Sequence, residues 1–353
     1  MNKEKSSKTE NPNWEDFESL INAESKKIDS ILSRAQTIKQ QSFGNTLKVY
    51  IPGRKFPAIS ITGDNCELNC EHCNRKYLKG MKPITNSKNL EAFLMEHHRN
   101  GGIGALISGG SLSDGSVPLF NYLDTIKKVK NKTDLIINTH TGLIDERTAQ
   151  KLADAGVDII SFDVNMDKEI IEDIYHLDKD LKDYKKAIDL LEQYKLNIVP
   201  HICIGLHYGN LNKELESLKY IKESKIKPSL IVLIALIPPN RLNKRFKTPS
   251  SSDIAKVIAI TRFMFPKTEI SLGCMRPRKK TRYSLEMKAL KAGITRIEMP
   301  LKKVLNAFKE ENPQINYKFF SACCAVPKRY EKYIKMEEKE LNRRYKNLIK
   351  NVE

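Results

Sequence analysis

The chain has 353 residues, a formal net charge of +18 and seven cysteines. No apolar run approaches the roughly 20 residues that cross a bilayer, and the polar amino terminus lacks the apolar core of a secretion signal. We therefore expect a cytoplasmic protein that spans no membrane. The odd cysteine count argues against a disulfide framework and favours metal or redox chemistry. The positive charge is scattered, which predicts solvated helix faces or an acidic protein partner and not a nucleic acid.

The amino-terminal region divides into two parts. Residues 1–13 are charged and polar, which predicts disorder. Residues 14–41 carry apolar side chains at helical spacing, so 14–44 are expected to form a helical extension.

A regular alternation of apolar runs and helical patterns fills residues 45–312. Eight such units predict a parallel sheet and, by their number, a TIM-type (β/α)8 barrel of the α/β class. The expected strands are FPAISIT, ALISGG, LIINTHTG, IISFDVN, NIVPHICIGL, SLIVLIALIPP, EISLGCM and TRIEMP, and the expected helices lie near 88–99, 118–130, 145–155, 180–194, 211–224, after Ser250, and near 282–292 and 301–311.

A separate carboxy-terminal segment, residues 313–353, follows the eighth unit. It begins with the apolar stretch NYKFFSACCAVP at 316–327 and continues with a Lys- and Glu-rich pattern at 328–350 that predicts one helix.

Three cysteines follow the first predicted strand as C-x3-C-x2-C, at Cys66, Cys70 and Cys73. Thiolates suit iron–sulfur clusters and zinc. Three of them can bind three irons of a 4Fe-4S cluster and leave the fourth iron open. A structural zinc site would need a fourth ligand, for which His72 is the available candidate.

This cysteine loop, placed after the first strand of a predicted barrel, resembles that of the radical S-adenosylmethionine (radical SAM) superfamily. The resemblance implies that the open iron binds S-adenosylmethionine, and that one electron cleaves this cofactor to a radical that abstracts hydrogen from the substrate. It places His72 where the family contacts the adenine and Ser108, Gly109 and Gly110 where it contacts the methionyl amine. A simple turn would also account for the two glycines.

Polar residues follow further strands at the expected catalytic face. Asn138 ends the third predicted strand region and Asp163 the fourth. Because barrel chemistry occurs at the carboxyl ends of the strands, both are candidate cofactor-binding residues. Ordinary, satisfied loop residues would look the same in sequence.

A second set of cysteines stands later in the chain. Cys274 ends the seventh predicted strand, and Cys323 and Cys324 lie in the carboxy-terminal segment. If that segment folds over the barrel mouth, the three thiols meet and can hold an auxiliary 4Fe-4S cluster. Three buried apolar cysteines are the plain alternative. Candidates for a fourth ligand are Ser321, Cys203, Arg276 or a substrate atom.

The segments SITGDNCELNCEHC, LISGG, INTHTG and SLGCMRPR resemble the biotin synthase branch of the superfamily. With the late Cys-Cys pair, the chain looks like a subunit of the two-component lipoyl synthases. That resemblance implies sulfur insertion into an octanoyl chain carried by a lipoyl domain or the glycine-cleavage H protein. It also implies a paralogous partner subunit and an electron donor, while the second cluster supplies the sulfur.

Three other readings stay open. A biotin synthase-like enzyme would act on a free small molecule, by sulfur insertion or by rearranging an amino-acid carbon skeleton; Arg276 favours it. A non-catalytic iron–sulfur scaffold would not cleave S-adenosylmethionine. A nucleic-acid-modifying radical enzyme fits the charge, but the sequence shows no appended RNA-binding module.

Overall fold

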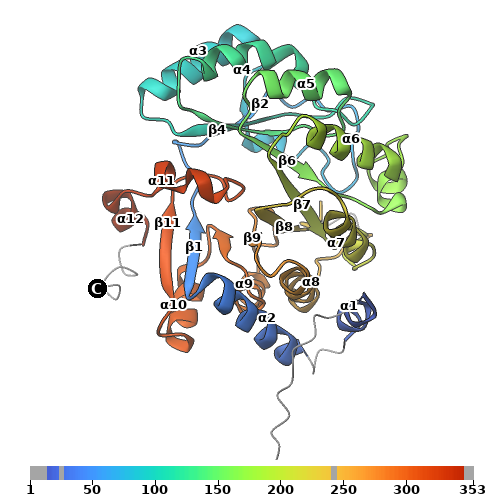
Figure 1. Ribbon diagram of the computed structural model, residues 1–353, viewed down its shortest axis with the longest axis vertical. Helices are drawn as coiled ribbons and strands as arrows, with labels where there is room; N and C mark the ends of the chain where they lie inside the picture. The colour runs from blue at the N-terminus through green and yellow to red at the C-terminus, as the bar shows by residue number, and fades with distance from the viewer. Residues whose placement is uncertain (1–13, 24–27, 240–244, 346–353) are drawn as a thin grey trace, which may run out of the picture.

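One parallel sheet organises the chain in the computed structural model, which describes residues 14–23, 28–239 and 245–345. The described strands form a single eleven-stranded sheet with the order β11-β1-β10-β9-β8-β7-β6-β5-β4-β2-β3. Figure 1 shows that the sheet curls and that helices lie on its outer side. The predicted fold class is confirmed: the curled parallel sheet and its outer helices form an incomplete TIM-like barrel, open between the edge strands β11 and β3. The disorder expected for residues 1–13 lies outside the described residues.

The sequence predicted most of the strands but missed three. The additional strands are β1, β3 and β11, and β1 lies between β10 and β11. The strand bounds are Thr46–Tyr50 (β1), Ala58–Ser60 (β2), Lys82–Pro83 (β3), Gly104–Ser108 (β4), Ile136–His140 (β5), Ile159–Asp163 (β6), Ile198–Ile204 (β7), Leu230–Ala235 (β8), Glu269–Leu272 (β9), Arg296–Glu298 (β10) and Asn316–Phe320 (β11).

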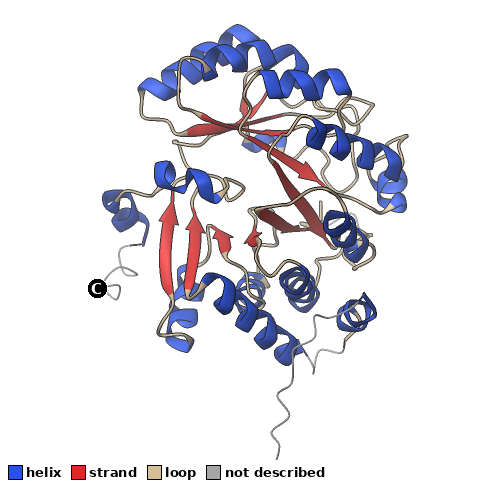
Figure 2. Ribbon diagram, viewed as in Figure 1, coloured by secondary structure: helices blue, strands red, loops and turns tan. Residues whose placement is uncertain are grey.

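Several of the helices between the strands begin at polar caps. Asn86, Asp145 and Ser250 each accept a hydrogen bond from a backbone N–H in the first helical turn, which satisfies a donor that the helix itself leaves free. Figure 2 shows these helices around the strands. Their bounds are Ser87–Arg99 (α3), Leu123–Lys130 (α4), Glu146–Asp154 (α5), Leu181–Gln193 (α6), Glu214–Glu223 (α7), Ser251–Met264 (α8), Arg282–Lys291 (α9) and Lys302–Glu311 (α10).

The amino-terminal extension is two helices, not the single helix predicted for 14–41. They are α1 (Trp14–Ile21) and α2 (Ile28–Phe43), and residues 22–23 have already left the helix. Helix α2 packs its buried apolar face against α8 and α9. The extension therefore stabilises the outer helical layer.

The carboxy-terminal segment does not form one continuous helix. The prediction of a single helix for 328–350 is therefore wrong for the residues that the structure describes. A 3-10 turn (η5, Lys328–Tyr330) and α11 (Glu331–Ile334) precede α12 (Glu338–Tyr345). Lys335 leaves the helix to pair with Phe320 in an isolated bridge. Residues 321–334, called the C-terminal plug here, turn back into the curl of the sheet because their apolar side chains are buried there.

The plug fills the interior of the curl. Its buried Ala322, Cys324 and Val326 share one apolar cluster with residues of β5 to β8. At its far end, Tyr330 donates its hydroxyl to Asp158, directly before β6, at 3.1 Å. The plug thus runs from the carboxyl end of β11 to the amino end of β6.

Among the described residues, every helix is too short or too polar to cross a bilayer.

Candidate active site at the carboxyl ends of the strands

The first cysteine set lies on a tightly wound loop after β2. The backbone N–H of Cys73 donates to the carbonyl of Cys70 at 3.1 Å. Asn69 and Asn74 adopt positive φ angles of 51° and 44°, a region that asparagine tolerates better than most residues. The local sequence therefore supports the turns that gather Cys66, Cys70 and Cys73.

The three thiols share one neighbourhood. Burial, together with the adjacent thiols of Cys66 and Cys73, raises the pKa of Cys70 to about 12. Because metals bind the thiolate form, a positively charged group must be present for all three to deprotonate together. No three His, Cys, Asp or Glu side chains among the described residues converge to hold a single ion. Each thiolate of an iron–sulfur cubane binds its own iron, so a cluster does not require the three thiols to converge on one point.

The glycine-rich turn after β4 packs directly on the cysteine loop. Gly110 donates its N–H to the hydroxyl of Thr62 at 2.7 Å. A Cβ atom on Gly110 would lie 2.0 Å from the carbonyl oxygen of Asn65 and 2.5 Å from Cβ of Cys66. Only glycine allows this approach. Gly109 and Ser108 precede it, and the Ser108 hydroxyl lies 3.5 Å from the carbonyl of His140.

His72 lies inside the site and not on the loop surface. Its ring centroid is 5.3 Å from that of Tyr175, which follows a π-helical turn (η4, Ile170–Ile174). Burial lowers the pKa of His72 to about 4, although Asp163 acts in the opposite direction. Its Nδ1 atom is buried without a hydrogen-bond partner. A neutral imidazole with a free nitrogen can bind a polar group of a ligand.

Asp163 stands at the centre of a group of histidines. Its Oδ2 lies 3.8 Å from Nδ1 of His140, whose ring is 5.1 Å from that of His201. Burial would raise the pKa of Asp163, but the hydrogen bond and charge of His140 outweigh it and lower this pKa. The carboxylate is 58% exposed even though these rings surround it, because it faces the space enclosed by the sheet. Asn138 is buried nearby in β5, and its Nδ2 has no partner.

The second cysteine set comes together from two distant parts of the chain. Cys274 follows β9, and the plug brings Cys323 and Cys324 beside it. Burial raises the pKa of Cys274 to about 12, and the neighbouring Cys324 and Glu298 contribute. The Cys324 thiol contacts the side chains of Cys323 and Ser271. All three cysteines are free thiols.

Tyr77 belongs to the first cysteine loop. Burial, together with Cys203, Cys73 and Cys274, raises its pKa.

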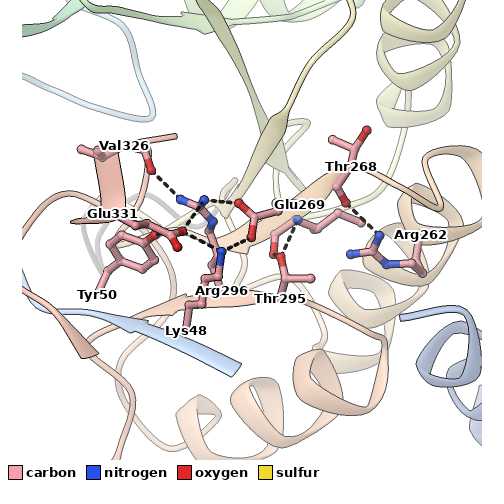
Figure 3. Close-up of polar contacts among 10 residues, drawn as sticks. Lys48, Tyr50, Arg262, Thr268, Glu269, Thr295, Arg296, Val326 and Glu331 are labelled. Carbon is pink, nitrogen blue, oxygen red and sulfur yellow. Dashed lines mark hydrogen bonds and ion pairs between the residues drawn. The ribbon is translucent and has the colours of Figure 1, made fainter. Parts of the chain in front are cut away.

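A buried ionic cluster anchors the plug (Figure 3). Arg296 of β10 is fully buried, donates to the carbonyl of Val326 at 2.5 Å, and pairs with Glu331 at 3.0 Å and with Glu269. Lys48 of β1 pairs with both glutamates at 2.5 and 2.6 Å. Breaking a buried pair by removing one partner leaves an uncompensated charge, so this cluster fixes where the plug lies.

The three protein residues predicted as a possible fourth ligand lie as follows. The hydroxyl of Ser321 donates to Glu340 at 3.2 Å, beside a surface hollow of about 470 Å³. Arg276 is fully buried; its guanidinium donates to Gly273, Glu286 and the carbonyl of Glu298. Burial and the charges of Asp163 and Glu214 raise the pKa of Cys203, and this residue lines a small cavity together with Asp163 and His201.

Two residues of these sites were missed by sequence reasoning. His201 stands inside an apolar strand run, and Glu298 stands in the short run TRIEMP. A charged or imidazole side chain inside a buried strand was the available signal, because such groups are rarely buried without a partner.

Part of the chain, including the first cysteine loop, is similar to a known family. Residues 60–221 match the Radical SAM superfamily. A biotin synthase from Pelobacter propionicus is 22% identical over 263 residues, covering 72% of this chain and 76% of that protein. A biotin synthase from Saccharopolyspora erythraea is 24% identical over 280 residues, covering 73% and 72%.

Solved structures share the fold. The FeFe-hydrogenase maturase HydG from Carboxydothermus hydrogenoformans superposes with a TM-score of 0.66 at 14% identity, over 97% of this chain and 85% of that one. Methylornithine synthase superposes with a TM-score of 0.59 at 19% identity, over 80% and 81%. At these identities the likeness is one of architecture.

Proposed function

Because this chain carries a radical SAM domain and has low-identity relatives among the biotin synthases, we propose that it is a sulfur-inserting enzyme acting on the octanoyl chain of a lipoyl carrier protein. It would be one subunit of a two-component lipoyl synthase. The observation that supports this most is that the chain carries a second group of free cysteines apart from the first cysteine loop: Cys274 after β9, with Cys323 and Cys324 in the plug.

The first set has the residues that the radical cofactors require. Cys66, Cys70 and Cys73 would hold the 4Fe-4S cluster. When bound, this cluster reduces S-adenosylmethionine and so supplies the means of removing hydrogen from an unactivated carbon. Gly110 lies directly against Cys66, and the Nδ1 of His72, which has no hydrogen-bond partner in the structure, would be available to the cofactor. Asp163 would bind hydroxyl groups, because its carboxylate is ionised and accepts hydrogen bonds.

The second set would hold the sulfur donor. Cys274, Cys323 and Cys324 are the described thiols near the carboxyl end of β9, and an auxiliary 4Fe-4S cluster on them contains the sulfide that must enter the substrate. The buried ionic cluster around Arg296 keeps the plug in place while that sulfide is removed.

The carrier partner is inferred from charge. A chain with a net charge of +18 attracts an acidic protein over distances of about 10 Å at moderate salt. We propose an octanoylated lipoyl domain or glycine-cleavage H protein as this partner. A paralogous subunit would add the other sulfur, and a separate electron donor would reduce the first cluster.

The decisive experiment combines cluster counting with a sulfur-insertion assay. Wild type and the Cys66/Cys70/Cys73→Ala and Cys274/Cys323/Cys324→Ala triples are reconstituted anaerobically, and iron and sulfide are measured. We expect about eight irons in the wild type and about four in each triple. Each protein is then given S-adenosylmethionine, a reductant and an octanoylated H protein. The carrier should gain sulfur only with the wild type.

A second candidate is sulfur insertion into a free small molecule, favoured by the biotin synthase relatives. The same assay separates the two, because dethiobiotin or another free acceptor replaces the carrier in parallel reactions. Sulfur gained by the free molecule and not by the carrier would favour the second candidate. If the wild type binds only about four irons, and Cys274/Cys323/Cys324→Ala binds the same number, there is no auxiliary cluster and the lipoyl proposal fails.

A further inference from the structure

The carboxyl end of β10 brings a buried carboxylate to the second cysteine set. Strands β1 and β10 lie side by side, with Lys48 opposite Arg296 and Tyr50 opposite Glu298 in the register of the sheet. Residues two apart in a strand point to the same face. Since Arg296 points inward to Val326 and Glu331 (Figure 3), Glu298 also points inward, one layer closer to the carboxyl ends. Its side chain is 3% exposed.

Two arginines hold one oxygen of this carboxylate. Oε2 of Glu298 lies 3.5 Å from Nη1 of Arg276 and 3.4 Å from Nη2 of Arg278. Arg278 also donates to the carbonyl of Cys274 at 3.0 Å. No described residue is hydrogen-bonded to Oε1. The arginines therefore fix the carboxylate beside the strand end that carries Cys274.

Glu298 neighbours two of the three thiols. Its charge acts on Cys274 and on Cys324, which reach it from β9 and from the plug. Arg278 provides the direct link, because the Nη2 atom that lies 3.4 Å from the Glu298 carboxylate also donates to the carbonyl of Cys274 at 3.0 Å. Of the protein groups first considered for a fourth ligand, Ser321 donates to Glu340, Arg276 pairs with Glu286 and with Glu298, and Cys203 lines a small cavity with Asp163 and His201.

We infer that Glu298 is the fourth, oxygen-donating ligand of the cluster held by Cys274, Cys323 and Cys324. This inference rests on the proposed function, because it requires a cluster at the second set. A carboxylate oxygen is a harder donor than a thiolate and binds the iron of a sulfide cluster less strongly. The iron bound to Glu298 would be the one most easily released, which suits a cluster that gives up sulfide.

The test uses the full-length Cys66/Cys70/Cys73→Ala protein, in which only the second set can hold iron. After reconstitution with ⁵⁷Fe and sulfide, we expect about four irons per chain, one of them distinct in its Mössbauer spectrum. Adding Glu298→Gln should remove the distinct iron and leave about three, with the paramagnetic signal of a three-iron cluster. The matched control is Glu286→Gln, because Glu286 is a fully buried carboxylate that pairs with the same Arg276. This variant should keep about four irons per chain.

Each other outcome has a definite meaning. If Glu298→Gln keeps all the irons and an unchanged spectrum, Glu298 is not a ligand, while the second cluster stands. If the parent triple binds no iron, the second cluster and the proposed function fail together with this inference. Should Glu298→Gln not fold, Glu298→Cys gives the answer: it should keep about four irons and lose the distinct one. An unchanged distinct iron in that variant would overturn the assignment.

Discussion

Arg296 of β10 and Glu331 of α11 form an ion pair 3.0 Å long inside the curled sheet. Thirty-five residues of sequence separate them, and between them the chain leaves the sheet, returns through β11 and enters the interior. The same guanidinium donates to the backbone of Val326, two residues after Cys324. One buried arginine thus determines the position of the cysteine pair on which the proposed sulfur donor depends.

Replacing Arg296 should loosen the plug. In Arg296→Met, Glu269 and Glu331 keep Lys48 as a shared cation, and we expect the free energy of unfolding to fall by about 3–5 kcal/mol. Denaturant unfolding of the metal-free protein measures this. The control is Lys291→Gln, which breaks an ion pair whose side chains are about half exposed and should cost less than about 1 kcal/mol. Equal stability of the two variants would show that the buried cluster does not anchor the plug.

His201 should make the fold sensitive to mild acid. Burial lowers its pKa to about 4, whereas an unfolded histidine titrates near pH 6.5. As the pH falls from about 6.5 towards 4, His201 binds a proton in the unfolded chain but stays neutral in the folded chain. The free energy of unfolding therefore decreases over this range. Titration of His201 alone should lower the free energy of unfolding by up to about 2 kcal/mol between about pH 7 and pH 5.

The comparison of His201→Gln with wild type tests that loss. Urea unfolding of the metal-free proteins at the two pH values should show a smaller decrease for the variant. His98→Gln, on the outer helix α3, should keep the full decrease. An identical decrease in wild type and His201→Gln would rule out this histidine as the source.

Gly110→Ala should disrupt the first cysteine loop. The added Cβ would meet backbone and Cys66 at 2.0–2.7 Å, so the loop must move, at a cost of about 1–3 kcal/mol. Iron bound by the first set should fall, as measured in a Cys274/Cys323/Cys324→Ala background. Gly80→Ala is the matched control, since its Cβ meets nothing within 4 Å. Full iron loading of Gly110→Ala would contradict the expected close approach.

Salt should weaken the action on an acidic carrier. Raising ionic strength from about 0.01 M to 0.15 M shortens the screening length from ~30 Å to ~8 Å. For a chain of charge +18 we expect the KM for an octanoylated carrier to rise severalfold, with kcat little changed. A short octanoyl-lysine peptide without net charge provides the reference. A salt-independent KM would exclude electrostatic attraction as the basis of carrier binding.

Much of the fold was predictable because its signals are local. Apolar runs such as LIVLIA are buried throughout as β8, and caps such as Asp145 begin helices where the sequence places them. The carboxy-terminal segment was not predictable in the same way. Its pattern at 328–345 is typical of a surface helix, yet Glu331 turns inward because Arg296 and Lys48, distant in sequence, are there to pair with it.

The candidate site divides along the same line. The first cysteine loop and Gly110 could be recognised in the sequence because their signals are local. The three cysteines, and the glycines of the turn, each lie within a few residues of one another. The pairing of His140 with Asp163, and the approach of Glu298 to Cys274, depend on strand register and on which face each residue takes. A shift of one residue would reverse both, so single-sequence patterns do not determine them.

The plug also sets an order of events during synthesis. The ribosome makes β1 to β10 before residues 321–334 exist, so the inward faces of β5 to β8, including Ile136, Ile159 and Val199, have no covering until then. A nascent chain at that stage exposes apolar surface and depends on chaperones or on rapid completion. Under the proposed function, the loop that carries Cys66, Cys70 and Cys73 would be complete long before the second cysteine set, which assembles only once the plug has entered. The two proposed clusters would then be loaded in sequence, that of the first loop before that of the plug.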